Sequence, residues 1–565
     1  MPTITIDGTA CEFEKGQMIL QVAKANGIEI PHYCYHEGLS IVASCRICLV
    51  EVWAPNPRND YKLEAIPKLL PACQTPAGEG QVVYLDSPKV LANQKQVMEY
   101  LLINHPLDCP VCDQAGECYL QDYSYRYGRS VSRFEDDKIK QPKKDLGPTV
   151  YLYSDRCIMC SRCVRFTREI SGTSELCVVG RGATEQIDLF PGKALDNEMS
   201  GNVVDVCPVG AMLDKDFLFS QRVWFMTSTP SIDGLTAGGD NIHIEHNKGT
   251  VYRIKPRTNP DVNKWWISDE VRYGYKHIHS DDRLTSPHRA QHGERINTTW
   301  PSILEEVDSV ITRMVGNGAT VAALISPMLT CEEAFLIADY AKGWHVNRGQ
   351  AIIGIGPVPV DGEDRTYPPT AKPGDANAYT VRAEKAPNAR GVKRVLAAMA
   401  GDGKGDLSEP MDFDAWLEAV KAADIVIITG NYPNDWVPKE LTRAVTKKFV
   451  VHVDTLTNGL SVKADVVLPS STWAEKSGTF ENVDGLLQVF EQAIEPIDGA
   501  APEGRIFTHL ITLAEGKPLT DAPHYDAGLI RQRLAEEVGL TEFVDTISIP
   551  VQIQKAEPDV AIVDL

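Results

Sequence analysis

Thirteen of the fourteen cysteines in this 565-residue chain lie within residues 1–207, and this crowding constrains the fold more than any other feature. Eleven of them, with one histidine, form three groups of four soft ligands: Cys34, Cys45, Cys48 and Cys73; His105, Cys109, Cys112 and Cys118; Cys157, Cys160, Cys163 and Cys207. In a reducing compartment such crowding indicates bound metal rather than disulfides. The spacings predict an electron-transfer protein with three iron–sulfur clusters.

The first group predicts a [2Fe–2S] cluster within a small β-rich domain at residues 1–78. Its loop cysteines followed by a remote Cys73 match the layout of plant-type ferredoxins, with ten residues between the first two cysteines in place of four. We expect a hairpin that turns at Asp7-Gly8, a helix over residues 18–26 and a strand over residues 48–53. The alternative is a zinc site built on Cys45 and Cys48, although zinc sites usually pair two short-spaced ligand couples.

The second group, in residues 79–119, predicts a [4Fe–4S] cluster with a histidine ligand. A helix expected over residues 88–103 ends just before His105. A lone histidine here is more often structural, but Cys109, Cys112 and Cys118 leave a tetranuclear cluster one ligand short. A neutral imidazole in place of a thiolate removes negative charge, so we hypothesise a raised cluster potential.

The third group, in residues 140–220, predicts a second [4Fe–4S] cluster. Cys157, Cys160 and Cys163 have the tight spacing of bacterial ferredoxin sites, and Cys207 precedes a proline as the usual fourth ligand does. Cys177 competes for the fourth position. The Cys-Pro-x-Gly-Ala context favours Cys207, which leaves Cys177 as an inert thiol.

These three modules, in this order, resemble the large iron–sulfur subunits of NADH:quinone oxidoreductase, the family to which the mitochondrial 75 kDa-type subunit of respiratory complex I belongs. The resemblance covers residues 1–220, where all twelve ligand positions are present. It implies a β-grasp ferredoxin domain and a position for all three clusters between flavin and quinone. It also implies partners: the flavin- and NADH-binding subunit, the small [2Fe–2S] subunit of the input module, and the iron–sulfur subunits of the quinone module.

The rest of the chain resembles molybdopterin oxidoreductases more weakly. Residues 221–277 resemble their small N-terminal lobe, through the stretches 251–259 and 265–269, but no cysteine lies between Cys207 and Cys331. An extra distal cluster is therefore expected to be absent. Residues 278–520 read as an α/β domain, with strands expected at 321–325, 425–428 and 450–454 and a helix at 412–423. Cys331 lies in a helix-like run, so we expect no molybdenum pterin.

The last segment, residues 521–565, is expected to form a helix over 526–538 and a strand-like stretch over 547–554. Roles for this segment and for Cys11, Cys177 and Cys331 do not follow from the sequence.

Charge and hydropathy exclude several classes of function. The net charge of −21 argues against nucleic-acid binding, and no apolar run is long enough to span a membrane. No Gly-x-Gly-x-x-Gly motif opens a helix, so neither NAD nor flavin is expected on this chain. We expect a peripheral protein on the cytoplasmic side of the bacterial inner membrane, with membrane contact only through a complex and no signal peptide.

The leading interpretation is an electron-transfer subunit of an NADH dehydrogenase with no catalytic residues of its own. The main alternative is the α chain of an NAD-linked formate dehydrogenase, which needs a molybdenum-ligating Cys or selenocysteine. A hydrogenase would need further cysteines downstream. A zinc-held scaffold without a redox role is a third class.

Overall fold

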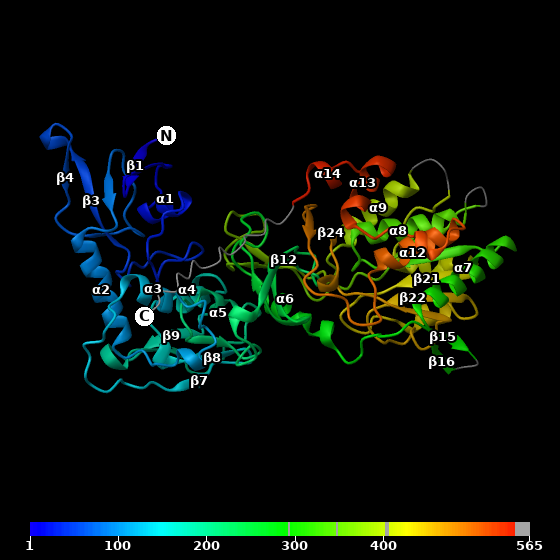
Figure 1. Cartoon of the computed structure of the whole chain (residues 1–565), viewed down its shortest axis with the longest axis horizontal. Coiled ribbons are helices and arrows are strands. Elements are labelled where there is room, and N and C mark those ends of the chain that lie inside the picture. Colours follow the sequence, from blue (N-terminus) through cyan, green and yellow to red (C-terminus); the bar gives the residue numbers. More distant parts are fainter. Residues whose placement is uncertain (292–293, 346–348, 402–405, 549–565) are drawn as a thin grey trace. The chain divides into compact units, whose positions relative to one another are not determined.

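The computed structural model describes residues 1–291, 294–345, 349–401 and 406–548, which form two compact units. The N-terminal unit comprises residues 1–226 and 366–378, and the C-terminal unit comprises the rest of the described chain (Figure 1). The sequence predicts a multidomain α/β and α+β fold, in which a small β-rich ferredoxin domain and loop-rich cluster modules precede an α/β domain, and this fold class is confirmed.

The N-terminal unit contains five α-helices and eleven complete strands among its described residues. The helices are α1 (Ile19–Ala25), α2 (Pro88–Leu102), α3 (Tyr119–Tyr127), α4 (Arg162–Glu169) and α5 (Asn202–Val206). The strands are β1 (Thr3–Ile6), β2 (Thr9–Glu12), β3 (Leu49–Asn56), β4 (Lys62–Ala65), β5 (Leu70–Pro71), β6 (Val82–Tyr84), β7 (Lys143–Asp145), β8 (Val150–Tyr153), β9 (Leu176–Val179), β10 (Gln186–Leu189) and β11 (Met212–Asp214).

Its first sheet has the strand order β2-β1-β6-β3-β4, with β5 paired to β3. The expected hairpin forms because Asp7 and Gly8 both adopt the positive φ angles, 45° and 80°, that a tight turn requires. The helix expected over residues 18–26 forms as α1, and it packs its apolar residues on the sheet. Strand β6 lies between β1 and β3 but comes after residue 78, so the sheet extends past the expected domain boundary.

Residues 366–378 pack with the N-terminal unit, although the sequence places them inside the expected α/β domain at 278–520. A side chain on Gly172 would bring its Cβ within 2.7 Å of the Pro369 ring. The hydroxyl of Tyr367 donates a hydrogen bond to Glu198 at 2.5 Å. These contacts hold residues 366–378 against the N-terminal unit, which carries the cysteine groups.

The C-terminal unit is built on a sheet of order β16-β15-β23-β22-β21-β17-β18, in which the five strands from β23 to β18 are parallel. Helices cover both faces of this sheet. Residues of α7, α8 and α12 (Figure 1) pack in one hydrophobic core, and residues of α10 and α11 pack in the other. The strand order reverses between β17 and β21, which makes the carboxyl edge there a topological switch point.

The large sheet consists of β15 (His288–Gln291), β16 (Glu294–Asn297), β17 (Val321–Ile325), β18 (Ile352–Ile355), β21 (Ile425–Thr429), β22 (Phe449–Asp454) and β23 (Val466–Pro469). Its helices are α7 (Trp300–Gly316), α8 (Cys331–Gly343), α9 (Ala389–Ala400), α10 (Phe413–Ala419), α11 (Lys439–Ala444) and α12 (Glu503–Ala514). The expected strands at 321–325, 425–428 and 450–454 correspond to β17, β21 and β22.

The small lobe is an antiparallel sheet of β12 (Thr227–Ile232), β13 (Asn241–Asn247) and β14 (Thr250–Pro256), followed by α6 (Asp269–Tyr273). Its core also contains Trp473, Phe480 and Phe490, so it is closed by residues far away in the sequence. The remaining short strands are β19 (Arg365–Tyr367), β20 (Tyr379–Val381), β24 (Gly478–Glu481) and β25 (Leu487–Phe490).

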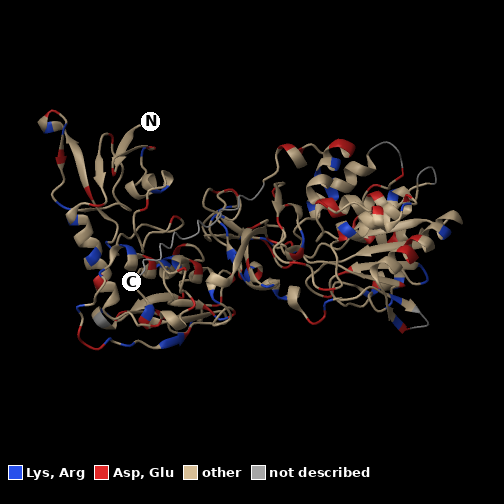
Figure 2. Cartoon of the chain, in the orientation of Figure 1, with Lys and Arg blue, Asp and Glu red and all other residues tan. Residues whose placement is uncertain are grey.

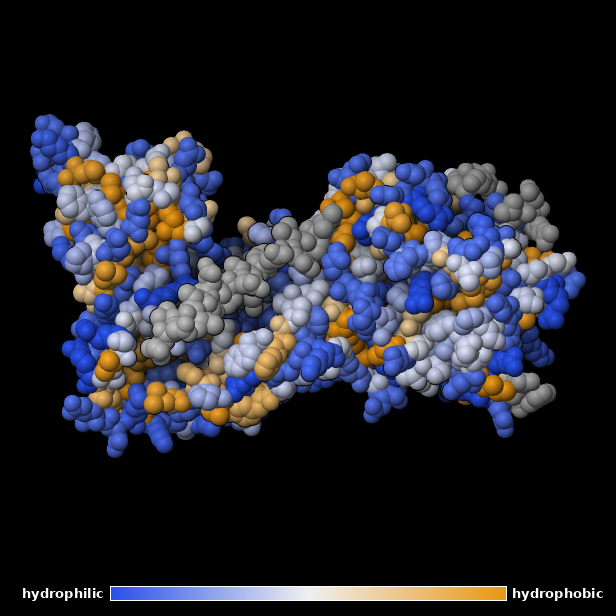
Figure 3. Space-filling view, in the orientation of Figure 1, coloured by the Kyte–Doolittle hydropathy of each residue, from blue (hydrophilic) through white to orange (hydrophobic). Residues whose placement is uncertain are grey.

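The chain continues with α13 (Ala527–Val538), as expected, and α14 (Glu542–Asp545). Most of the strand-like stretch expected at 547–554 lies outside the described residues. Within the part that the structure describes, no helix combines the length and hydrophobicity needed to cross a membrane. Basic and acidic residues are interspersed along both units (Figure 2), and hydrophobic residues on the visible face form several separate patches (Figure 3).

Candidate metal centres

The first cysteine group is assembled by one long loop and one strand pairing. Cys34 and Cys45 lie in the loop between α1 and β3, and Cys48 ends it. Strand β5 pairs with the start of β3, which brings Cys73 beside Cys48 with their sulfur atoms 3.5 Å apart. Ala43 and Arg46 adopt positive φ angles of 50° and 60°, a costly conformation that bends the loop around its thiols.

These four thiols are buried or half-buried and influence one another electrostatically. A hydrogen bond from Cys45 lowers the pKa of the Cys34 thiol to about 5, and the same bond together with burial raises the pKa of Cys45. The bond with Cys73 and burial likewise raise the pKa of Cys48. Four thiols crowded out of water favour a bound cation, which stabilises their thiolate forms.

The second group follows α2, which ends at Leu102 and places His105 near the next loop. Burial lowers the pKa of His105 to about 4, with Arg156 and Lys138 acting in the same direction. Within the described chain, its buried Nδ1 atom has no hydrogen-bond partner. A neutral imidazole with an unused nitrogen fits the ligand role predicted for it.

The three cysteines of this group lie between α2 and α3. Cys109 is exposed in a single 3₁₀ turn, and Cys112 ends that turn. Cys118 immediately precedes α3, and burial raises its pKa to about 12. The neighbouring thiols Cys112 and Cys207 add to that rise, which indicates that this loop lies close to the third group.

The third group lines one small pocket together with apolar residues such as Ile187 and Met212. The pocket includes Cys207, the fourth ligand predicted from the sequence, and its lining does not include Cys177. Between the cysteines of the loop, Met159 and Ser161 adopt positive φ angles of 53° and 59°. These two residues turn the chain so that its thiols line the same pocket.

Burial is the main reason that the thiols of the third group resist ionisation. It raises the pKa of Cys157 to about 12 and that of Cys160 to about 11, and it raises the pKa of Cys163 well above its ordinary value. In each case neighbouring thiols contribute to the rise. The site thus needs positive charge from a bound group before all its sulfurs can be thiolates.

The second and third groups are in direct contact. A Cβ atom on Gly210 would lie 2.2 Å from the sulfur of Cys112, so only glycine fits at this position of the Cys-Pro-Val-Gly turn. The backbone N–H of Tyr119 donates to the carbonyl of Pro208 at 3.1 Å. The buried guanidinium of Arg156 pairs with Asp108 at 2.9 Å and joins the two loops further.

Sequence reasoning missed the buried arginines among the ligand loops. Arg156, Arg162 and Arg165 are each at most 5% exposed. Their only sequence signal is that they lie within two positions of cysteines of the third group, and charged side chains are normally expected at the surface.

The remaining cysteines lie apart from the three groups. Cys11 is buried in the first sheet, Cys177 lies on β9, and Cys331 begins α8 with its sulfur 3.5 Å from the amide of Asn388. Across the described ranges, no set of three or more His, Cys, Asp or Glu side chains is arranged to hold a single metal ion. A polynuclear cluster is wider than one ion, so its ligands can lie further apart.

Five family models match the chain. They are the 2Fe-2S iron-sulfur cluster binding domain at residues 1–88, the NADH-ubiquinone oxidoreductase-G iron-sulfur binding region at 94–133 and the ferredoxin-like domain of NADH-quinone oxidoreductase subunit 3 at 147–213. The NADH-ubiquinone oxidoreductase NDSU1/NuoG-like 4Fe-4S domain matches residues 226–276, although that stretch contains no cysteine. The molybdopterin oxidoreductase model matches residues 400–512.

The curated relatives carry consistent names. The G-type subunit of NADH-quinone oxidoreductase from Rickettsia felis is 37% identical over 60% of this chain and 48% of its own length. The NADH-ubiquinone oxidoreductase 75 kDa subunit of Reclinomonas americana is 40% identical over 58% of this chain and 47% of its own. The mitochondrial 78 kDa subunit of Candida albicans is 38% identical over 60% and 45%.

Among solved structures, a chain of NAD⁺-reducing [NiFe]-hydrogenase in the H₂-reduced state is 28% identical. It covers 39% of this chain and 91% of that chain with a TM-score of 0.34, a likeness too low to support an argument. The chain spans about half the length of the curated relatives it matches. By its sequence matches and its iron–sulfur domains, the chain is a homologue of the G-type subunit of NADH-quinone oxidoreductase.

Proposed function

We propose that this chain is the large electron-transfer subunit of an NADH:quinone oxidoreductase and holds one [2Fe–2S] and two [4Fe–4S] clusters. The single observation that carries the proposal is the set of three ligand groups within one unit, of which the second and third meet at Gly210. The ligands are those predicted from the sequence: Cys34, Cys45, Cys48 and Cys73; His105, Cys109, Cys112 and Cys118; Cys157, Cys160, Cys163 and Cys207.

When bound, such clusters accept and donate single electrons. The chain's own residues hold the ligands at fixed positions and exclude water from most of them. They also provide the charges that tune each site, such as Arg156 beside His105. No nucleophile or proton-transferring residue is required for this task.

The partners we propose are the flavin- and NADH-binding subunit, the small [2Fe–2S] subunit of the input module and the iron–sulfur subunits of the quinone module. Large hydrophobic side chains are exposed in the His105–Cys118 loop, where Leu107 is 87% exposed and Val111 55%. Phe219, which is 62% exposed, lies beside this loop, since its backbone N–H donates to Asp113 at 2.8 Å. Exposed apolar side chains grouped near a redox site favour a protein partner there. In a complete complex we place the chain on the cytoplasmic side of the bacterial inner membrane.

The carboxyl edge of the large sheet, from the switch point to β23, supports the proposal that this chain binds no molybdenum pterin. Phosphate groups of cofactors bind at such edges through backbone N–H groups and helix N-termini. Here Asp454 accepts the N–H groups of Asn431 at 2.8 Å and of Thr455 at 2.7 Å. Glu475 accepts the N–H of Thr472 at 2.7 Å. The chain's own carboxylates thus already use donors that a phosphate would need.

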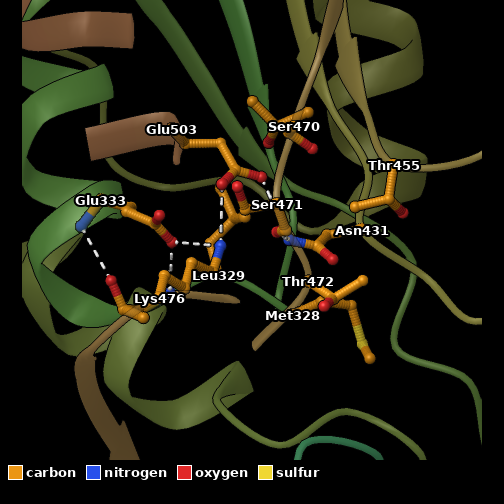
Figure 4. Close-up of polar contacts among 12 residues, drawn as sticks. Met328, Leu329, Glu333, Asn431, Thr455, Ser470, Ser471, Thr472, Lys476 and Glu503 are labelled. Carbon is orange, nitrogen blue, oxygen red and sulfur yellow. Dashed lines mark hydrogen bonds and ion pairs between the residues drawn. The ribbon is translucent and has the colours of Figure 1, made fainter. Parts of the chain in front are cut away.

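A buried pair of carboxylates that share one lysine extends this argument. Glu333 and Glu503 each lie 2.8 Å from the ammonium group of Lys476, and all three side chains are buried (Figure 4). Two carboxylates and one lysine leave no spare positive charge for an anionic cofactor. The formate dehydrogenase alternative, which requires such a cofactor, is not favoured.

The test is the content of iron, acid-labile sulfide, zinc and molybdenum in anaerobically purified protein, with electron paramagnetic resonance after reduction. We expect roughly ten irons per chain, one binuclear and two tetranuclear signals, and no molybdenum. Cys160→Ala should remove one tetranuclear signal, while the matched variant Cys331→Ala should keep all three. Stoichiometric molybdenum would favour the dehydrogenase, and zinc in place of iron would favour a scaffold.

A further inference from the structure

Helix α4 carries two buried arginines that form no ion pair with a carboxylate among the described residues. Arg162 and Arg165 are 5% and 3% exposed, and they lie one turn apart on the same face of the helix. Among the described residues, no Asp or Glu lies within ion-pair distance of either guanidinium group. Burying an unpaired charge is very costly. Burial lowers the pKa of Arg165, and the thiols of Cys160 and Cys34 together with the nearby Glu169 act against that shift, so the negative groups around the cysteines help to balance this charge.

Each guanidinium group joins the loop of the first cysteine group to that of the third. Arg165 donates through Nη2 to the carbonyl of Cys34 at 2.5 Å and to that of Cys160 at 3.3 Å. Arg162 donates to the carbonyl of Tyr35 at 2.5 Å and to that of Val206 at 3.2 Å. Tyr35 follows the ligand Cys34, and Val206 precedes the ligand Cys207, so both arginines bridge the same two sites.

We propose that Arg162 and Arg165 are positioning residues that couple the binuclear cluster to the Cys157–Cys207 cluster. Their charges balance the negative charge of both thiolate sets at once, and their hydrogen bonds hold the two loops at a fixed separation. Because a nearby positive charge stabilises the reduced, more negative form, the pair raises both reduction potentials. This inference rests on the proposed function, since it requires clusters at both sites.

The test compares variants by iron content and by the midpoint potentials of each signal in redox titrations followed by electron paramagnetic resonance. Arg165→Gln removes the charge and the forked hydrogen bonds, whereas Arg165→Lys keeps the charge. The matched control is Arg168→Gln on the same helix, because Arg168 is 62% exposed and pairs with Glu169 at 2.9 Å.

In Arg165→Gln we expect the binuclear and Cys157–Cys207 signals either to shift together to lower potential or to be lost together. The His105–Cys118 signal should persist in either case. The midpoint potentials of Arg165→Lys should lie closer to those of the wild-type protein than the potentials of Arg165→Gln do. If Arg165→Gln loses all three signals through misfolding, Arg162→Gln takes its place with the same expectations.

The proposal would be overturned by potentials that match those of the Arg168→Gln control, or by a change confined to one of the two signals. A lysine variant whose potentials fall as far as those of the glutamine variant would also overturn it. If the wild-type protein itself lacked the clusters, the proposed function would fail instead.

Discussion

At the scale of single residues, Gly210 gives a sharp test of how the two tetranuclear sites fit together. An alanine Cβ here would lie 2.2 Å from the sulfur of Cys112 and 3.0 Å from the Cβ of Gln114. Relieving such overlap costs about 1–3 kcal/mol and moves the ligand thiol. We expect Gly210→Ala to lose the His105–Cys118 cluster, so that iron falls from about ten to about six per chain.

The control for this variant is Gly316→Ala, since a Cβ atom at Gly316 meets nothing within 4 Å. It should keep all its iron. A Gly210→Ala protein with full iron and three unchanged signals would show that the Cys112 thiol is not held against this turn.

His105 tests whether the ligand's charge tunes its cluster. Burial holds the imidazole neutral, because its pKa is lowered to about 4. A thiolate at this position would add one negative charge to the site, which stabilises the oxidised form. His105→Cys should therefore keep the cluster but lower its midpoint potential in a redox titration. The signals of the other two clusters are internal controls, and an unchanged midpoint would remove the tuning argument.

At the scale of elements, helices and strands with local sequence signals were predicted, whereas pairings between segments far apart in the sequence were missed. The helix expected at 88–103 is α2, because Pro88 at its start and the apolar spacing are both local features. Strand β6 has only three residues, and its place between β1 and β3 depends on partners that are far away in the sequence. Segment 366–378 was missed because nothing local shows which unit a loop packs on.

The candidate sites follow the same pattern. Ligand spacing is a local property, so the sequence predicts the group of Cys157, Cys160 and Cys163, whereas the distant Cys207 is predicted from its Cys-Pro-x-Gly-Ala context. All four line one pocket, and their role as cluster ligands stays a prediction. The bridging role of Arg165 could not be predicted, because its partner Cys34 is 131 positions away. Whether a guanidinium lies in solvent or between two loops depends on the assembled fold.

The carboxylate pair between α8 and α12 predicts a pH dependence of stability. Burial and the neighbouring Glu333 raise the pKa of Glu503 from 4.5 to about 8. The folded chain therefore holds a proton that the unfolded chain releases, so this contribution is complete below pH 4.5 and is lost as pH rises towards about 8.

We expect Glu503→Gln to remove that dependence. The difference in unfolding free energy, wild type minus variant, should fall by up to about 1.4 kcal/mol per pH unit across this window. Thermal unfolding at several pH values measures it. Glu536→Gln, at an exposed position of α13, is the matched control. A constant difference across the window would contradict the assignment.

At the scale of the whole molecule, the metal sites and the large α/β sheet belong to different units. All twelve predicted ligands lie in the N-terminal unit, and the large sheet with its two hydrophobic cores lies in the C-terminal unit. The N-terminal unit has a hydrophobic core of its own under the first sheet, but much of its remaining chain consists of ligand loops and short strands. Its stability should therefore depend on bound metal far more than that of the C-terminal unit.

Calorimetry of the protein before and after removal of iron by a chelator tests this division. We expect two transitions, because the units have separate cores and need not unfold together. Removing iron should lower the transition of the N-terminal unit by about 10 °C or more, since cluster binding contributes directly to folding. The transition of the C-terminal unit should stay in place, and Glu503→Gln identifies it, because only that transition loses its pH dependence in the variant. Equal shifts of both transitions would mean that the cores beneath the large sheet need the metal sites to remain folded.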